Sequence, residues 1–236
     1  MKLIVSDKIK EMFPSLRIGV VTGVVKNEQK YSELNQCCKQ AYVEFKNKYP
    51  SNEQLFQQKN ILIWRETYRK IGVNPKKKVP TAESFLSRIV KGNFTPQICP
   101  IVDAYLVAER LCCLPIGGYD LSMVEGDIDL RISSGNEVFQ GLGSDAEELT
   151  EPGEIVYSDE GSILTRRWNY RDAKHTSIHK DSKNVALFVE APTLDIRDDE
   201  LSKTLEEISK NLREYCGAES NYFIFDTAKN SSVEVC

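Results

Sequence analysis

Two stretches of this sequence carry residue types that could bind a ligand or take part in catalysis. The first, Leu114 to Asp120 (LPIGGYD), places a proline and two adjacent glycines directly after an apolar, helix-like segment. Glycine adopts positive φ at little cost and lets another group approach the backbone closely. We therefore expect Gly117 and Gly118 to shape a ligand site, with a plain turn as the alternative interpretation.

The second stretch, Thr165 to Asp172 (TRRWNYRD), gathers three arginines, a tryptophan, an asparagine and an aspartate behind a strand-like run. Guanidinium groups bind carboxylates and phosphates through paired hydrogen bonds and stack on planar rings. This composition predicts a site for an anion or a planar group. The alternative is a solvated strand end whose arginines form their own salt bridges.

Other catalytic patterns are missing or incomplete. The only two histidines are His175 and His179, and no H-E-x-x-H or C-x-x-C completes a set of metal ligands. There is no G-x-S-x-G, and the GxG at 141–143 lacks the remaining parts of a dinucleotide fingerprint. The seven cysteines are irregularly spaced, which is typical of reduced thiols. We predict neither a metal nor a cofactor.

Charge is divided into blocks along the chain. Lys and Arg outnumber acids by eight to two over 65–91 and by six to two over 166–183, whereas twelve acids and one arginine lie in 120–160. The two basic blocks predict one positive face, with the acidic segment turned away, as binding to a phosphate backbone requires. The alternative is that Lys76 to Lys78 form a solvated turn after Pro75.

Length and hydropathy favour a globular protein. With 236 residues, of which 41% are hydrophobic, the chain can bury a substantial core in one or two domains. No apolar run approaches a membrane span, and the N-terminus carries charges where a signal peptide would be apolar. We expect a cytoplasmic location and no membrane partner.

Hydrophobic periodicity predicts an α+β fold. Helices are predicted at 8–13, 29–49, 51–70 with an interruption, 81–92, 101–113 and 198–215. Strands are predicted at 3–5, 18–25, 126–132, 137–139, 154–157, 163–167, 184–190 and 222–225. The wholly apolar run 184–190 is expected at the centre of the sheet. Residues 229–236 are expected to be frayed.

Six motifs occur in the order seen in one known family. They are YRKIGVNPKKKVPTAESFLSRIVKG (68–92), VDAY (102–105), LPIGGYDL (114–121), GDIDLRIS (126–133), RRWNYRD (166–172) and NVALFVEA (184–191). Together they resemble the B3/B4 domain of the bacterial phenylalanyl-tRNA synthetase beta subunit, in a free-standing form with no synthetase around it. The resemblance covers about half of the chain and is more specific for the domain than for an activity.

The resemblance implies an α+β domain at 68–191 with a mixed, mostly antiparallel sheet and flanking helices. Residues 1–67 would form an N-terminal α/β extension, and 192–236 a C-terminal helix and strand that complete the same globule. In the synthetases this module hydrolyses tyrosine wrongly attached to the phenylalanine tRNA, using a bound water and the ribose hydroxyl of the substrate. Such ester cleavage depends on positioning and electrostatics more than on a protein nucleophile.

Position by position, the resemblance is mixed. The histidine of the synthetases' P-x-H-x-x-D segment corresponds to Gly117, the acid that senses the tyrosine hydroxyl falls near Asp172, and the tandem glycines of the pocket are replaced by residues 166–171. Three arginines there should prefer a carboxylate, a phosphate or a ring over a bare phenol. The resemblance and the residue types together predict Asp172 and Asn169 as catalytic residues. Substrate contacts are predicted at Gly117, Gly118, Asp120, Arg166, Arg167, Trp168, Arg171 and Thr176, and RNA contacts at Lys76, Lys77, Lys78 and Arg88.

The leading functional hypothesis is a module that binds the aminoacylated 3′ end of tRNA and hydrolyses a mischarged ester in trans. It is not expected to be a complete tRNA ligase. The alternative is a non-catalytic protein of the same fold that binds RNA or a small anionic metabolite. No DNA partner is expected, because the net charge is −4.

Overall fold

The computed structural model describes residues 1–26, 30–93 and 98–236. The start of the helix predicted from Gln29 and part of the link predicted after Asn93 lie outside these residues. The helices are α1 (Asp7–Met12), α2 (Tyr31–Lys48), α3 (Asn52–Leu55), α4 (Lys59–Lys70), α5 (Thr81–Val90), α6 (Pro100–Cys112) and α7 (Asp198–Cys216), with a 3₁₀ turn η1 (Leu121–Met123). None of the helices in the described part of the chain is long and apolar enough to cross a bilayer.

The strands are short and form three sheets. They are β1 (Lys2–Val5), β2 (Arg17–Val25), β3 (Ile116–Asp120), β4 (Ile128–Ile132), β5 (Val138–Gln140), β6 (Glu147–Leu149), β7 (Ile155–Ser158), β8 (Ile163–Arg166), β9 (Arg171–Asp172), β10 (Asn184–Ala191), β11 (Ala218–Asp226) and β12 (Ser232–Glu234). Every pairing between them is antiparallel except β1 with β4. The fold is α+β, as predicted.

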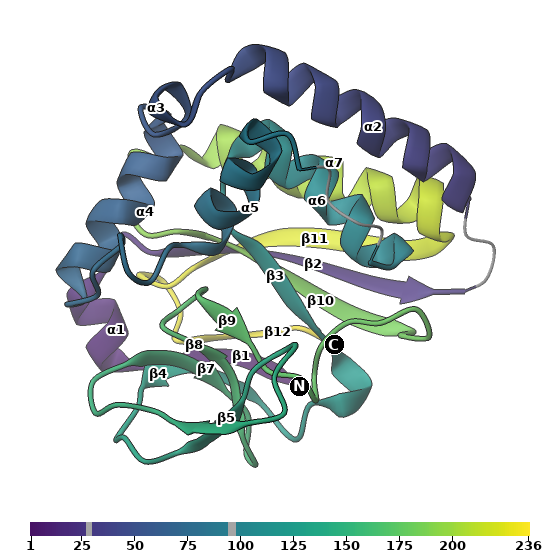
Figure 1. Cartoon of the computed structure of the whole chain (residues 1–236). Helices are drawn as coiled ribbons and strands as arrows, with labels where there is room; N and C mark the ends of the chain where they lie inside the picture. The colour runs from purple at the N-terminus through teal and green to yellow at the C-terminus, as the bar shows by residue number, and fades with distance from the viewer. Residues whose placement is uncertain (27–29, 94–97) are drawn as a thin grey trace.

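One sheet has the order β11-β2-β10-β3 and is covered on one face by helices (Figure 1). Helix α7 packs on β11 and β2, α6 packs on α7, and α2 packs on α6. The repeat Leu201, Leu205, Ile208, Leu212 explains the helix, because residues three and four apart share a face and all four are fully buried. Strand β10 lies between two neighbours, as its apolar sequence predicts.

The second large sheet has the order β12-β1-β4-β7-β8-β9 and lies on the other side of the four-stranded sheet (Figure 1). Strand β12 pairs antiparallel with β1, and the amino group of Met1 donates to the backbone carbonyl of Cys236 at 3.1 Å. The prediction that 229–236 is frayed is therefore wrong. The local sequence gives no signal for β12, because its hydrogen-bonded partner lies more than two hundred residues away in sequence.

Aromatic side chains fill the space between the two sheets. The Tyr157 ring of β7 stacks on Phe188 of β10 with centroids 5.8 Å apart, and Tyr119 of β3 lies 5.7 Å from the same ring. Trp168 meets Phe13 edge-on at 4.8 Å and Trp64 at 5.4 Å, and it is fully buried. These aromatic contacts pack the two sheets against each other around the candidate site described below.

The glycine pair, for which a plain turn was the alternative interpretation, lies within strand β3. Gly117 and Gly118 pair with Phe188 and Leu187 of β10, and neither has a positive φ. A Cβ atom on Gly118 would come 2.1 Å from the backbone oxygen of Ala186. Gly118 is therefore required by the close approach of two strands, not by turn geometry.

Candidate functional site

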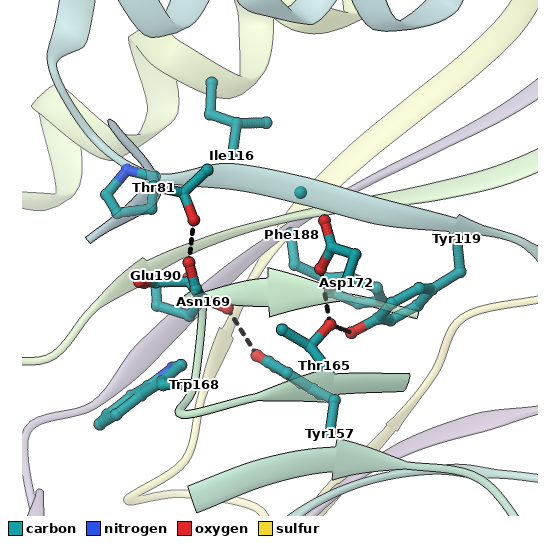
Figure 2. Close-up of a pocket in the computed structure, with 12 residues that line it drawn as sticks. Thr81, Ile116, Tyr119, Tyr157, Thr165, Trp168, Asn169, Asp172, Phe188 and Glu190 are labelled. Carbon is teal, nitrogen blue, oxygen red and sulfur yellow. Dashed lines mark hydrogen bonds between the residues drawn. The ribbon is translucent and has the colours of Figure 1, made fainter. Parts of the chain in front are cut away.

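A small pocket lies where the two large sheets meet, between β3, the turn after β8 and the end of β10 (Figure 2). It is lined by Thr81, Pro115, Ile116, Gly117, Tyr119, Tyr157, Thr165, Trp168, Asn169, Asp172, Phe188 and Glu190. The cavity volume is about 20 Å³, which is enough for one water molecule and too small for an amino-acid side chain. A larger ligand has to displace part of the wall.

Asp172 is held by a chain of hydroxyl groups (Figure 2). Thr165 Oγ1 donates to Asp172 Oδ1 at 2.7 Å, and the Tyr119 hydroxyl lies 2.7 Å from Thr165 Oγ1. Because the Thr165 proton points to the carboxylate, Tyr119 is the donor in its own pair. One carboxylate oxygen is thus fixed, and the other faces Gly117, where an added Cβ would lie 3.8 Å away. Burial raises the pKa of Asp172, and the bond from Thr165 opposes that shift.

Glu190 is the second acid of the pocket. Its carboxylate accepts a hydrogen bond from the Tyr157 hydroxyl at 2.7 Å, and the residue is 3% exposed. Burial raises the pKa of Glu190 to about 7, opposed by the Tyr157 bond, and the nearby charge of Asp172 adds to the increase. Among the described residues, no Lys or Arg forms an ion pair with Asp172 or Glu190. Each of these carboxyls, when ionised, therefore carries a negative charge that no described Lys or Arg pairs with.

A third carboxyl lies behind the pocket, on helix α6. Glu109 is fully buried, and neither of its carboxylate oxygens has a hydrogen-bond partner. Burial raises its pKa well above the ordinary value, and Asp172 contributes to the increase. A buried carboxyl without a partner is stable only when protonated. A protonated Glu109 is neutral and therefore does not change the net charge of the pocket.

The turn between β8 and β9 places Trp168 and Asn169 in the wall. Two consecutive residues, Arg167 and Trp168, have left-handed φ values of 48° and 71°. Such a conformation costs on the order of 1–3 kcal/mol per non-glycine residue, and it persists only where the surroundings impose it. Here the burial of the Trp168 ring and its backbone bond to Ile155 O at 2.8 Å impose it.

Asn169 offers the pocket an unused hydrogen-bond donor. Its Oδ1 accepts from the Tyr68 hydroxyl at 2.7 Å, and its backbone oxygen accepts from Thr81 Oγ1. Its Nδ2 is buried and forms no hydrogen bond of normal geometry, although the amide is close enough to Glu190 to oppose the rise in the pKa of that carboxyl. Since an unpaired buried donor costs roughly 1–3 kcal/mol, this amide favours a ligand that brings an acceptor oxygen.

A family model described as the B3/4 domain matches residues 63–217, well over half of the chain. This chain belongs to the B3/4 domain family. The matched region contains every residue that lines the pocket. The family expected from the motifs at 68–191 is thereby confirmed.

The B3/4 domain is also similar to one solved structure described as an N-terminal fragment of the phenylalanyl-tRNA synthetase beta subunit from Pyrococcus horikoshii. The two chains are 14% identical, with a TM-score of 0.46. The match covers 92% of this chain and 49% of that one, so the chain spans about half the length of the solved fragment. A search of curated proteins returned no match.

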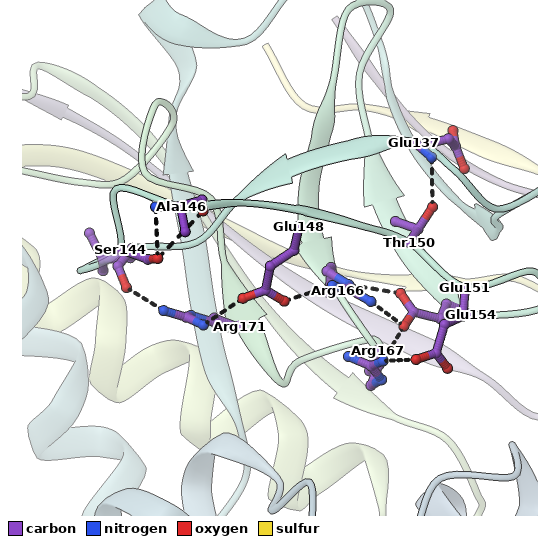
Figure 3. A network of polar contacts seen from close by, with 11 residues as sticks. Glu137, Ser144, Ala146, Glu148, Thr150, Glu151, Glu154, Arg166, Arg167 and Arg171 are labelled. Atoms are coloured by element: carbon purple, nitrogen blue, oxygen red, sulfur yellow. Dashed lines mark hydrogen bonds and ion pairs between the residues drawn. The ribbon is translucent and has the colours of Figure 1, made fainter.

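The three arginines expected in the pocket of this B3/4 domain point away from it, into a network with glutamates (Figure 3). Arg166 pairs with both oxygens of Glu154, at 2.9 and 2.5 Å, and also reaches Glu148 at 2.9 Å. Arg167 is bound to Glu154 and, at 3.2 Å, to Glu151, and Arg171 lies 3.2 Å from Glu148.

These pairs overturn the expectation that the acidic segment turns away from the basic block. The acids at 148–154 fold directly onto the arginines that follow them in sequence. Arg166 and Arg167 are 3% and 7% exposed, so a solvent anion meets little of either guanidinium. The reason is physical: strand pairing brings two oppositely charged segments together, and burying either alone would be far more costly.

The remaining predicted substrate contacts lie in different places. Trp168 and Gly117 line the pocket beside Asp172 and Asn169, whereas Gly118 does not. Asp120 accepts from Ser122 N at 3.0 Å and lies 3.6 Å from His179 Nε2, outside the lining. Thr176 is buried without a partner for its hydroxyl, and its backbone oxygen accepts from Asp120 N.

The predicted RNA contacts lie at opposite ends of helix α5. Lys76 and Lys77 are exposed on the turn that leads into the helix, and Lys78 places its ammonium 5.1 Å from the centre of the Tyr170 ring. Arg88 is exposed in the last turn. Lys78 is therefore next to the pocket, since Tyr170 follows Asn169.

Sequence reasoning missed four polar groups of the site: Glu190, Tyr157, Tyr119 and Thr165. For Glu190 a signal existed, because it is the one acid in the otherwise apolar strand after Asn184. A lone acid in a buried strand has to be protonated, paired or functional. The two tyrosines and the threonine gave no local signal, since each is an ordinary strand residue whose role depends on what lies opposite.

Proposed function

We propose that this protein binds aminoacylated tRNA and hydrolyses the ester of a mischarged aminoacyl group in trans. The observation that carries the proposal is a pair of pocket carboxyls that no described Lys or Arg pairs with, beside an amide group that forms no hydrogen bond of normal geometry. An aminoacyl ester supplies both complements in adjacent positions, because its α-ammonium is a cation and its ester carbonyl is an acceptor.

In this proposal Asp172 binds the α-ammonium group. Its Oδ1 is occupied by Thr165, and its Oδ2 faces the gap left by the missing side chain of Gly117. A charge-assisted bond of this kind is shorter and stronger than a neutral one. Asn169 Nδ2 donates to the carbonyl oxygen, where negative charge develops as water attacks.

Glu190 takes the role of proton acceptor for the attacking water. A base works best when its pKa is close to the working pH, and burial raises the pKa of Glu190 to about 7. Water oxygen bonds to the carbonyl carbon as Glu190 takes one proton, the bond from that carbon to the ribose oxygen then breaks, and the proton passes to this oxygen. The products are a free amino acid and a tRNA with its ribose hydroxyl restored.

Support for the RNA half of the proposal comes from family membership and from charge. The B3/4 match and the resemblance to a synthetase beta subunit make tRNA the expected polymer. The exposed Lys76 and Lys77, with Lys78 beside them, are suited to phosphate contacts next to the pocket. Aminoacyl-tRNA is a substrate of the cytoplasm, which we therefore propose as the place of action.

The decisive experiment is a single-turnover deacylation assay over a panel of correctly and wrongly charged tRNAs. We expect rapid release of the amino acid from at least one mischarged tRNA and no release from its correctly charged counterpart. The Asp172→Asn variant serves as the control for contaminating esterase. Release at the uncatalysed rate from every member of the panel would rule out the hydrolase.

The non-catalytic alternative has one observation in its favour, the cavity volume of about 20 Å³, which admits only water. It predicts tRNA binding with no deacylation on the same panel. A small anionic metabolite, by contrast, finds no support in the pocket. The arginines that would have attracted it are bound to glutamates, and the pocket acids would repel it.

A further inference from the structure

The segment that carries the predicted RNA contacts also closes the pocket. Residues 74–78 form a tight turn in which the backbone N–H groups of Lys77 and Lys78 both donate to Asn74 O, at 3.0 and 2.9 Å. The Asn74 side chain accepts from Lys76 N at 2.9 Å. Two residues, Val79 and Pro80, join this turn to Thr81, the first residue of α5 and part of the pocket wall.

Two contacts join this segment to the strained turn on the opposite side of the pocket. Thr81 Oγ1 donates to the backbone oxygen of Asn169 (Figure 2), and the Lys78 ammonium lies over the Tyr170 ring at 5.1 Å. Both contacts fall on the two residues that follow the left-handed pair Arg167 and Trp168. We call these two contacts, Thr81 with Asn169 and Lys78 with Tyr170, the clasp. The clasp joins a cationic segment to a strained turn.

A phosphate competes directly with one half of this clasp. The Lys78 ammonium is attracted to the Tyr170 ring only through the ring quadrupole, whereas a phosphate offers a full negative charge and several acceptor oxygens. Lys78 bound to RNA therefore leaves the ring. Between this segment and the turn, the Thr81 bond to Asn169 then remains, and it holds a turn that is already in an unfavourable conformation.

We propose that RNA binding at Lys78 releases this clasp, so that the pocket admits an aminoacyl group only when a polynucleotide is bound. The proposal rests on the RNA-binding part of the function proposed above and adds its regulation. By linkage, a ligand that needs the open pocket and an RNA that favours it must strengthen each other's binding. Without bound RNA the pocket would stay closed, so that free amino acids would not bind and their simple esters would not be hydrolysed.

The test uses Trp168, which lines the pocket and is fully buried. The chain has two tryptophans, so Trp64→Phe leaves Trp168 as the sole reporter and keeps an aromatic ring against it. We expect saturating uncharged tRNA at low salt to increase acrylamide quenching of Trp168 at least twofold. Bound tRNA with unchanged quenching would overturn the proposal.

Two variants in the Trp64→Phe background separate the clasp from RNA affinity. Lys78→Gln should abolish the quenching response at saturating tRNA. Its matched control, Lys76→Gln, should need more tRNA to saturate and then give the full response, because Lys76 contacts no pocket residue among the described partners. Equal responses in the two variants would contradict a special role for Lys78.

A third variant tests the clasp without any RNA. Thr81→Val keeps the shape and removes the hydroxyl, so quenching of Trp168 should rise in the free protein, and tRNA should add little. If the protein binds no tRNA, the proposed function fails, whereas unchanged quenching in Thr81→Val refutes the clasp itself. If Trp64→Phe does not fold, hydrogen exchange at the amides of 167–170 in Thr81→Val and wild type decides the same point, faster exchange in the variant supporting the clasp.

Discussion

The two sides of the segment 165–172 differ in whether their charged side chains form ion pairs. On one side Arg166, Arg167 and Arg171 meet Glu148, Glu151 and Glu154, so that charges of both signs are balanced within the protein (Figure 3). On the other side Asp172 and Glu190 line the pocket, and no Lys or Arg in the described part of the chain forms an ion pair with either (Figure 2). Balanced buried charges hold strands together, whereas unbalanced ones leave room for a ligand of opposite charge.

The largest expected effect is on the balanced side. Glu154→Gln keeps the volume of the side chain and removes the charge shared by two buried arginines, so the free energy of unfolding should fall by about 3–5 kcal/mol. Urea titration of the variant at neutral pH measures this loss. A change below about 1 kcal/mol would show that the network is a solvated surface feature.

Glu190→Gln should increase the free energy of unfolding, whereas Glu154→Gln should decrease it. The increase is expected only at high pH. Since burial raises the folded-state pKa of Glu190 from 4.5 to about 7, the folded protein holds its proton more tightly than the unfolded chain does. Wild-type stability therefore falls as pH rises from about 4.5 through about 7. The neutral glutamine escapes this loss, so the variant should be more stable than wild type by about 3 kcal/mol at pH 8, and similar to it at pH 4. Thermal melts between pH 4 and pH 8 measure this gain in stability. Glu154→Gln should show no such gain.

Asp172→Asn should impair chemistry while leaving the fold intact. It removes the charge proposed to hold the substrate ammonium, and loss of one preorganised contact typically reduces a rate by on the order of 10²-fold or more. Single-turnover deacylation at saturating tRNA should show this loss with nearly unchanged affinity. Arg171→Gln, across the strand in the balanced network, should stay within a few-fold of wild type. Similar losses in both variants would erase the distinction between the two sides.

The adjacent glycines of β3 offer a finer comparison. Gly118→Ala forces a Cβ against the backbone of β10 and should reduce stability by about 1–3 kcal/mol. Gly117→Ala meets nothing closer than 3.8 Å and should melt within a few degrees of wild type. Its effect should fall on ligand binding, because the methyl group enters the space beside Asp172 Oδ2. Melting curves and binding curves for both variants separate a packing glycine from a pocket glycine.

The smallest effect is expected at the RNA face. Lys77→Ala should weaken tRNA binding a few-fold at low salt, reduce the slope of log affinity against log salt by about 1, and leave the deacylation rate of bound tRNA unchanged. Filter binding at several salt concentrations measures both quantities. An unchanged slope would mean that Lys77 contacts no phosphate and that these lysines form only a solvated turn.

Local pattern was sufficient for most of the elements. The helix at 198–216 follows from apolar residues spaced three and four apart, and the central strand at 184–191 from an unbroken apolar run. Both signals are written in neighbouring residues, and burial then confirms them. The motifs likewise identified the B3/4 family, which fixes the order of the elements without reference to their contacts.

The sequence by itself determined which side chains lie on the segment 165–172, and it led to the prediction that some of them bind a ligand. Only the tertiary structure decided which face each one takes. In a strand, successive side chains point to opposite sides, so Thr165 and Arg166 must lie on opposite faces. The partners on each face come from other segments of the chain. Glu154 immediately precedes β7, and Glu190 lies in β10. Charge pairing depends on distance through space and not along the chain. The sequence alone therefore could not show that the arginines pair with glutamates, whereas Asp172 and Glu190 line the pocket without such a partner among the described residues.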